Sequence, residues 1–110
     1  MSSDLAAKSC RANEGKVAAL NDQQIAVLLK QIPGWELADK TITRQFKFKN
    51  YYETMAFVNA TAWISHREDH HPDLAVGYNQ CRVTYSTHSV GGLSENDFIC
   101  AAKIEAIMKI

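Results

Sequence analysis

The stretch TITRQFKFKN, residues 41–50, decides the fold class, because a two-residue period gives way within it to the start of a helix. Ile42, Phe46 and Phe48 share one parity and alternate with polar side chains, which is the pattern of a strand with one buried face. Asn50, followed by Glu53 three residues later, matches the capping-box pattern that opens a helix. A half-buried strand that leads into a helix predicts a sheet with helices packed against it.

Three helices are predicted from their caps and stop signals. The first begins at Asn21, with Gln24 three residues on, and ends at Pro33-Gly34. The second runs from Asn50 to about His70, because Pro72 disfavours helical backbone in the residue before it. The third begins at Ser94, has Asp97 at its third position, and continues to the end of the chain.

Four strands are predicted around these helices. Residues 35–37 and 41–49 form the first pair, with a turn at 38–40, and residues 74–78 and 81–88 form a hairpin joined at Asn79-Gln80. In the last strand Cys81, Val83 and Tyr85 share one parity, and His88 falls on the opposite, polar parity. The expected fold is a single α+β domain in the order α-β-β-α-β-β-α, with a four-stranded antiparallel sheet and three helices packed on one face.

Length and charge narrow the function classes. The chain has 110 residues, 46% of them hydrophobic, and 12 basic against 12 acidic residues, so neither nucleic acid nor a membrane surface is an expected partner. Its three cysteines have no CxxC spacing, which favours a reducing compartment and predicts a cytoplasmic protein. Residues 1–19 are small, polar and aperiodic, so we expect a flexible, dispensable leader before a domain over residues 20–110.

The densest group of chemically active side chains is SHREDHHPDL, residues 65–74, which holds three of the four histidines. His66 and His70 are four residues apart and would share a helix face, so a metal site is one reading. The order HREDH departs from HExxH, however, and zinc sites in proteins usually have three or four protein ligands. Solvated imidazoles, or cations that cap the helix C-terminus, are a second reading.

Acid–base chemistry is the third reading of the histidines. Imidazole has a reference pKa of ~6.5, so it both donates and accepts protons near neutrality. His70 and His71 fall where a helix breaks into a loop, and His88 falls at the polar end of a strand, which are positions from which rigid elements present side chains to a cleft. Asp97 is placed to cap its helix and is also a candidate for orienting a histidine.

Several segments together resemble one enzyme family. EDHHPDL at 68–74, Tyr78-Asn79 and TYSTHSVGGLSENDF at 84–98, preceded by PGWEL at 33–37 and FKFKN at 46–50, resemble the pterin-4a-carbinolamine dehydratase family, also known as dimerization cofactor of a homeodomain transcription factor. The likeness runs from about Leu20 to the C-terminus. No one of these motifs is specific, but their combination and order are.

The resemblance implies an activity and a set of site residues. The activity is removal of water from 4a-hydroxytetrahydrobiopterin to give quinonoid dihydrobiopterin, which recycles the tetrahydropterin cofactor of aromatic amino acid hydroxylases. Neither a metal nor an organic cofactor is implied. The catalytic residues carried over are His70, His71 and His88, with Asp97 in support, and the pterin-contacting residues are Asp69, His70, His71, Ser86, Thr87, His88 and Ser89.

The resemblance also implies partners and shows departures. It implies a homodimer or homotetramer, a hydroxylase or transcription factor as a protein partner, and a nuclear location in addition to the cytoplasmic one. An alternative function is therefore an oligomeric module that stabilises a transcription factor dimer. His66 stands where the family commonly has glutamate, and Leu74 where it often has tryptophan.

Overall fold

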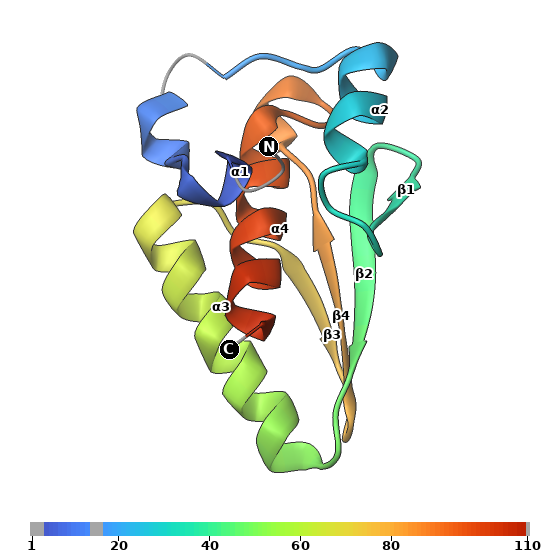
Figure 1. Ribbon diagram of the computed structural model, residues 1–110, viewed down its shortest axis with the longest axis vertical. Coiled ribbons are helices and arrows are strands. Elements are labelled where there is room, and N and C mark those ends of the chain that lie inside the picture. The colour runs from blue at the N-terminus through green and yellow to red at the C-terminus, as the bar shows by residue number, and fades with distance from the viewer. Residues whose placement is uncertain (1–3, 14–16, 110) are drawn as a thin grey trace.

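A computed structural model describes residues 4–13 and 17–109, and one layer of the fold is a four-stranded sheet with α3 (Tyr51–Glu68) and α4 (Glu95–Met108) on one side of it (Figure 1). The strands are β1 (Glu36–Ala38), β2 (Thr41–Lys47), β3 (Asp73–Val76) and β4 (Gln80–Tyr85). Their spatial order is β1-β2-β4-β3, and every neighbouring pair is antiparallel. The sheet predicted from the alternating segments is therefore confirmed.

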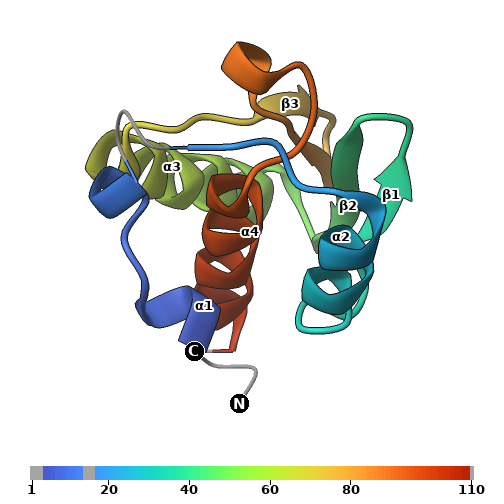
Figure 2. The same cartoon turned by 90° about the horizontal axis from the view of Figure 1, so that it is seen from above.

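The main helices are α2 (Asp22–Leu29), α3 (Tyr51–Glu68) and α4 (Glu95–Met108), and they begin where their caps predict. The side chain of Asn21 accepts a hydrogen bond from the backbone N–H of Gln24, and that of Asn50 from Glu53. Ser94 is the N-cap of α4, and its backbone N–H donates to the carboxylate of Asp97. In both views α4 lies between α2 and the N-terminal residues (Figures 1 and 2).

The boundaries of the strands differ from the predicted ones at the ends. β1 begins one residue later than expected, and Trp35 instead turns into the core, where its indole N–H donates to Glu105. The second hairpin turns between Gly77 and Gln80, whose backbone groups are hydrogen-bonded at 2.8 Å. β4 ends at Tyr85, so His88 lies in a short 3-10 turn, η2 (His88–Val90), instead of on the strand.

The N-terminal segment, residues 4–13, differs most from expectation. It forms α1 (Asp4–Ala7) and the 3-10 turn η1 (Cys10–Asn13), and both pack against α4. Leu5 and Cys10 are each only 2% exposed. The expectation of a flexible leader is therefore corrected for residues 4–13. Their two buried apolar side chains are too few to form a periodic pattern in the sequence, and they are covered by elements far away along the chain. Residues 1–3 and 14–16 of the expected leader lie outside the described residues.

The core lies between the sheet and the helices. The side chains on the inner face of β4, which are Cys81, Val83 and Tyr85, are fully buried, and so is Ile42 of β2. α4 contributes the largest share of buried apolar side chains, which are Phe98, Ile99, Cys100, Ala101, Ala102 and Ile104. Within the described residues, none of the helices is both long enough and apolar enough to cross a membrane.

Candidate active site

One small pocket contains all seven residues that the resemblance implied for substrate contact. Its volume is about 190 Å³, and it is lined by Asp69, His70, His71, Ser86, Thr87, His88 and Ser89. Asp69, His70 and His71 come from the end of α3 and the loop after it, whereas residues 86–89 run from the end of β4 into η2, which is remote in sequence. The fold therefore brings His88 together with His70 and His71, which sequence reasoning could place only on separate elements.

The end of α3 positions the first two histidines. Asp69 is the C-cap residue and has a left-handed backbone with φ of 53°, and its N–H donates to the carbonyl of Ser65. The N–H of His70 also points to Ser65 O, at 3.3 Å. This reversal turns the chain out of the helix, so His70 points inward with a side chain 14% exposed while His71 is exposed to solvent.

His70 contacts a buried carboxylate. Its Nε2 lies 2.7 Å from Oδ1 of Asp97, which is completely buried at the first turn of α4. Because an ionised carboxylate can only accept hydrogen bonds, Nε2 carries the proton in this pair, and in the neutral imidazole Nδ1 then keeps a free lone pair. Asp97 therefore fixes both the orientation and the tautomer of the imidazole.

The second oxygen of Asp97 is held by two further donors. Oδ2 accepts from the hydroxyl of Thr87 at 2.8 Å and from the backbone N–H of Ser94 at 3.0 Å. The hydroxyl proton of Thr87 is used in this bond, so the hydroxyl of Ser94, 2.8 Å away, donates to Thr87 in turn. The carboxylate has both a capping role and an orienting role, because its two oxygens face different partners.

An aromatic ring supports the other side of His70. The imidazole stacks on the phenol ring of Tyr85, with centroids 5.7 Å apart and planes only 9° from parallel. Burial raises the pKa of Tyr85 far above its ordinary value, and the nearby Cys100 thiol adds to this effect. Among the described residues the phenol hydroxyl makes no well-formed hydrogen bond, and it interacts only weakly with the Cys100 thiol. Tyr85 therefore acts here as a flat apolar wall.

His88 is presented by a loop that is closed at its base. Thr87 and Gly92 form a two-residue antiparallel bridge, in which Thr87 N–H donates to Gly92 O at 2.8 Å. Gly91 ends η2 with φ of 66°, in the left-handed region that glycine adopts without strain. Since Thr87 is also bonded to Asp97, the loop that carries His88 is attached to the same carboxylate that holds His70.

The structure separates His66 and Glu68 from this pocket. His66 is exposed on α3 and is not one of the lining residues, and the left-handed turn at Asp69 removes His70 from its helix face. Glu68 is buried and accepts a hydrogen bond from the backbone N–H of Cys10. Among the described residues, no three His, Cys, Asp or Glu side chains are grouped so as to hold a metal ion.

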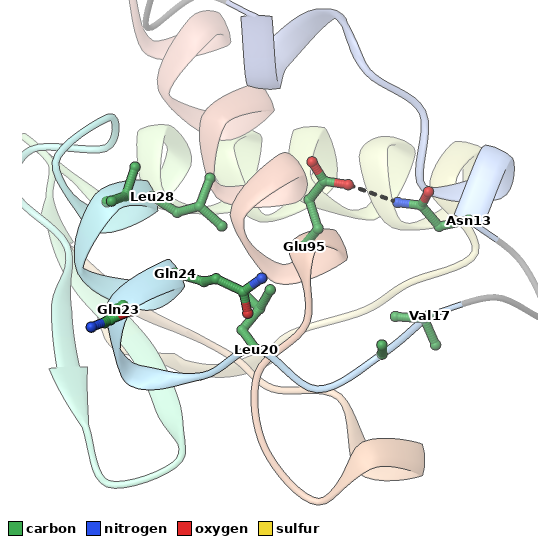
Figure 3. Close-up of a pocket in the computed structure, with 9 residues that line it drawn as sticks. Asn13, Val17, Leu20, Gln23, Gln24, Leu28 and Glu95 are labelled. Atoms are coloured by element: carbon green, nitrogen blue, oxygen red, sulfur yellow. Dashed lines mark hydrogen bonds between the residues drawn. The ribbon is translucent and has the colours of Figure 1, made fainter.

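A larger pocket, of about 560 Å³, lies between α2 and the start of α4 (Figure 3). Its wall is largely apolar, with Val17, Leu20 and Leu28 among the lining residues, and it has Glu95 at one side. It contains no histidine, and Glu95 is already engaged by Asn13 and Lys8. The smaller pocket is therefore the candidate for proton-transfer chemistry.

The chemistry open to the smaller pocket follows from its contents. An imidazole with a free Nδ1 and a carboxylate behind it is suited to accept a proton, because the carboxylate stabilises the imidazolium that forms. His88 and His71 add two more imidazoles to the lining of the same pocket. Asp69, Ser86 and Ser89 supply polar atoms around them, so a small polar molecule fits this site better than an apolar one.

Sequence reasoning missed several residues around the site. Thr87 was assigned to substrate contact and Ser94 to capping, but the Ser94 hydroxyl also bonds to the Thr87 hydroxyl, which donates to Asp97. Tyr85 was expected only as a core residue, but its ring also stacks on His70. The spacing of Ser94 and Asp97 gave the capping contact, but no local pattern marks the contact of Asp97 with His70. That contact depends on how α3 packs relative to α4.

Comparison with known proteins gives a consistent assignment. The profile of the family described as pterin 4 alpha carbinolamine dehydratase matches residues 18–107. A protein of Nitrosospira multiformis is 61% identical over 97% of this chain and 95% of its own, and one of Nitrosomonas eutropha is 62% identical over 96% and 94%. Both carry pterin-4-alpha-carbinolamine dehydratase as a provisional name.

Two solved structures are similar. A transcriptional coactivator/pterin dehydratase from Brucella melitensis superposes with a TM-score of 0.77 at 36% identity, covering 80% of this chain and 96% of its own. A pterin dehydratase-like protein identified as a RuBisCO assembly factor in the alpha-carboxysome has a TM-score of 0.55 at 24% identity, over 66% of this chain and 84% of its own, and shares the fold. With a profile match over most of its length and relatives above 60% identity, this chain belongs to the pterin-4-alpha-carbinolamine dehydratase family.

Proposed function

We propose that this protein dehydrates 4a-hydroxytetrahydrobiopterin to quinonoid dihydrobiopterin by histidine acid–base catalysis, without a metal or an organic cofactor. The observation that supports this most is that His70, His71 and His88 line one pocket, with His70 hydrogen-bonded to the buried Asp97. Membership of the family supports the substrate class. The reaction recycles the tetrahydropterin that aromatic amino acid hydroxylases use.

The elimination needs one proton acceptor and one proton donor. The N5–H proton leaves, the C4a–O bond breaks, a double bond forms between N5 and C4a, and the hydroxyl departs as water once it is protonated. We assign removal of the N5 proton to Nδ1 of His70, because Asp97 stabilises the resulting imidazolium. His88, on the opposite segment of the pocket, is assigned the protonation of the leaving hydroxyl.

The other lining residues are assigned to binding. His71 is exposed at the rim and orients the ring, and Asp69, Ser86 and Ser89 supply polar atoms for the amino and amide edge of the pterin. Thr87 lines the same pocket, with its hydroxyl proton held by Asp97. The volume of about 190 Å³ is below the ~300–1,000 Å³ of pockets for drug-sized ligands. The bicyclic ring therefore enters the pocket, and the pterin side chain stays in solvent.

The test is the dehydration rate of a synthetic 4a-hydroxytetrahydropterin in the presence of chelator-treated protein. Catalysis above the spontaneous reaction, by a factor of ~10² or more, is expected from a positioned acid–base pair. A rate equal to the spontaneous background would remove the enzymatic assignment. Activity that is lost with chelator and restored by zinc would favour a metal hydrolase instead.

A second candidate function is stabilisation of a transcription factor dimer, as an oligomeric module. It is supported by the similarity to a solved protein whose title names it both a transcriptional coactivator and a pterin dehydratase. The side chains of Trp63 and Tyr52 on α3 are 62% and 82% exposed, and such aromatic surface is common in protein interfaces. Replacing His70 and His88 separates the two functions, because it abolishes dehydration and leaves partner binding intact.

The assembly and location remain predictions. A homodimer or homotetramer is expected from the resemblance, and a hydroxylase is the other expected protein partner. A cytoplasmic location is expected from the cysteine usage, and a nuclear one in addition from the resemblance. Sedimentation of the purified protein checks the assembly, and imaging of a tagged protein checks the location.

A further inference from the structure

The C-terminal end of α3 is capped in part by a residue from the other end of the chain. The last carbonyl groups of a helix have no partner inside it and must be satisfied from outside. Ser65 O accepts from the N–H groups of Asp69 and His70. The next two carbonyls, of His66 and Arg67, accept from the guanidinium of Arg11, at 3.1 Å to Nη2 and 2.6 Å to Nε.

A second contact joins the same two regions beneath the surface. Oε1 of Glu68 accepts from the backbone N–H of Cys10 at 2.7 Å, and both residues are buried. Lys103 lies 3.8 Å from the other carboxylate oxygen and donates to Ala6 O at 2.8 Å. A buried carboxylate is costly unless it is paired and hydrogen-bonded, so the placement of Glu68 depends on the N-terminal segment.

The N-terminal segment is also attached to the start of α4. The side-chain amide of Asn13 donates to Glu95 Oε1 at 3.2 Å and to Asn96 Oδ1 at 3.0 Å, and the first of these bonds is drawn in Figure 3. Lys8 pairs with Glu95 at 2.6 Å. The segment thus spans from the residues just before Asp97 to the residues just before His70, at the end of the molecule where α3 ends and α4 begins (Figure 1).

We propose that the N-terminal segment is a positioning element of the candidate active site, and that Arg11 is its main positioning residue. This inference rests on the proposed function for its effect on catalysis. This one short segment bonds to the end of α3, which carries His70, and to the start of α4, which carries Asp97. These two helices hold His70 Nε2 at 2.7 Å from Asp97 Oδ1. The guanidinium suits this role because its planar fork donates to two neighbouring carbonyls at once. The family profile begins at residue 18, so it doesn't describe this segment.

The test compares Arg11→Ala with Lys8→Ala in the full-length protein. Both replace an exposed cation of the same segment, but the Lys8 ammonium pairs with Glu95 of α4, whereas the Arg11 guanidinium donates to carbonyls of α3. The first readout is native-state hydrogen exchange of the Asp69 and His70 amides, which report the cap of α3. Loss of two hydrogen bonds in Arg11→Ala is expected to raise their exchange about tenfold, against little change in Lys8→Ala.

The second readout is dehydration kinetics. Arg11→Ala is expected to lower kcat several-fold with little change in KM, because the proton-accepting geometry changes while the rim that binds substrate does not. Arg11→Lys, which can donate to one carbonyl at a time with a single ammonium, is expected to recover part of the loss.

Two results would overturn the proposal. One is exchange at Asp69 and His70 that is the same in Arg11→Ala and Lys8→Ala. The other is a rise of equal size at the amides of β4, which would signal a global loss of stability instead of a local one. Absence of dehydration in the wild-type protein would reject the proposed function, yet the exchange measurement would still decide whether Arg11 positions the end of α3.

Discussion

His70 Nε2 and Asp97 Oδ1 lie 2.7 Å apart although the two residues are 27 positions apart in sequence. The carboxylate is completely buried and belongs to the first turn of α4, where it accepts the capping bond from Ser94 N–H. Its position is therefore set by a helix and not by a loop. The imidazole is held between this carboxylate and the ring of Tyr85. The most constrained imidazole of the pocket is thus also the one with a partner suited to stabilise its cation.

Replacement of either proposed proton-transfer residue is expected to remove most of the catalysis. His70→Ala and His88→Ala should each lower kcat by ~10²–10⁴, which is the usual contribution of a positioned acid or base. The matched control is His66→Ala, because His66 is exposed on α3 outside the pocket and should leave kcat within about twofold of wild type. A His66→Ala loss as large as that of His70→Ala would contradict the assignment.

Asp97→Asn tests the tautomer of His70. Ser94 N–H and the Thr87 hydroxyl both donate to this side chain, so the asparagine would turn its amide oxygen toward them. Its NH₂ group would then donate to His70 Nε2, which forces the imidazole proton onto Nδ1. We expect a loss of kcat of ~10² or more, as in other histidine–carboxylate pairs with a reversed tautomer. Nitrogen NMR of the His70 ring measures the tautomer directly. An unchanged Nε2–H tautomer together with an unchanged kcat would show that Asp97 only caps α4.

Tyr85→Phe is expected to stabilise the protein, increasingly so at high pH. The phenol hydroxyl is buried, and among the described residues only a weak interaction with the Cys100 thiol offsets its burial, so its removal should raise the free energy of unfolding by about 1 kcal/mol. Burial raises the pKa of Tyr85, so above pH ~10 the unfolded chain releases this proton while the folded chain keeps it. Wild-type stability therefore falls as pH rises, and the advantage of Tyr85→Phe grows.

Urea unfolding at pH 7 and pH 10 measures this difference. Tyr52→Phe is the matched control, because its side chain is 82% exposed and should change stability little at either pH. A Tyr85→Phe protein less stable than wild type at both pH values would mean that the hydroxyl makes a stabilising contact.

Cys81 and Cys100 are expected to react slowly with thiol reagents in the folded protein. Burial raises the pKa of Cys81, and the neighbouring Cys10 thiol together with burial raises that of Cys100. Because the thiolate is the reactive form, both should stay protected at pH 9, where a free cysteine is largely ionised. The rate of modification by an aromatic disulfide, with and without urea, checks this. Rapid labelling of either residue in native protein would contradict the burial.

The sequence by itself determined the elements of this protein and their order. Asn21, Asn50 and Ser94 fixed the starts of the helices, because a cap depends on side chains within three residues of it. The alternation in residues 41–48 and 81–85 fixed which strand face is buried. The motifs shared with the family indicated which residues line the pocket, but the spacing of those residues did not indicate the role of each one.

The tertiary structure decided which of these residues meet. The contact of His70 with Asp97 depends on the crossing of α3 and α4 and on the left-handed turn at Asp69. The docking of Leu5 and Cys10, in a segment whose composition predicted no order, depends on apolar surface supplied by α4. Local patterns set helices and strands because backbone preferences act between near neighbours, whereas a site built from distant residues forms only when packing brings them together.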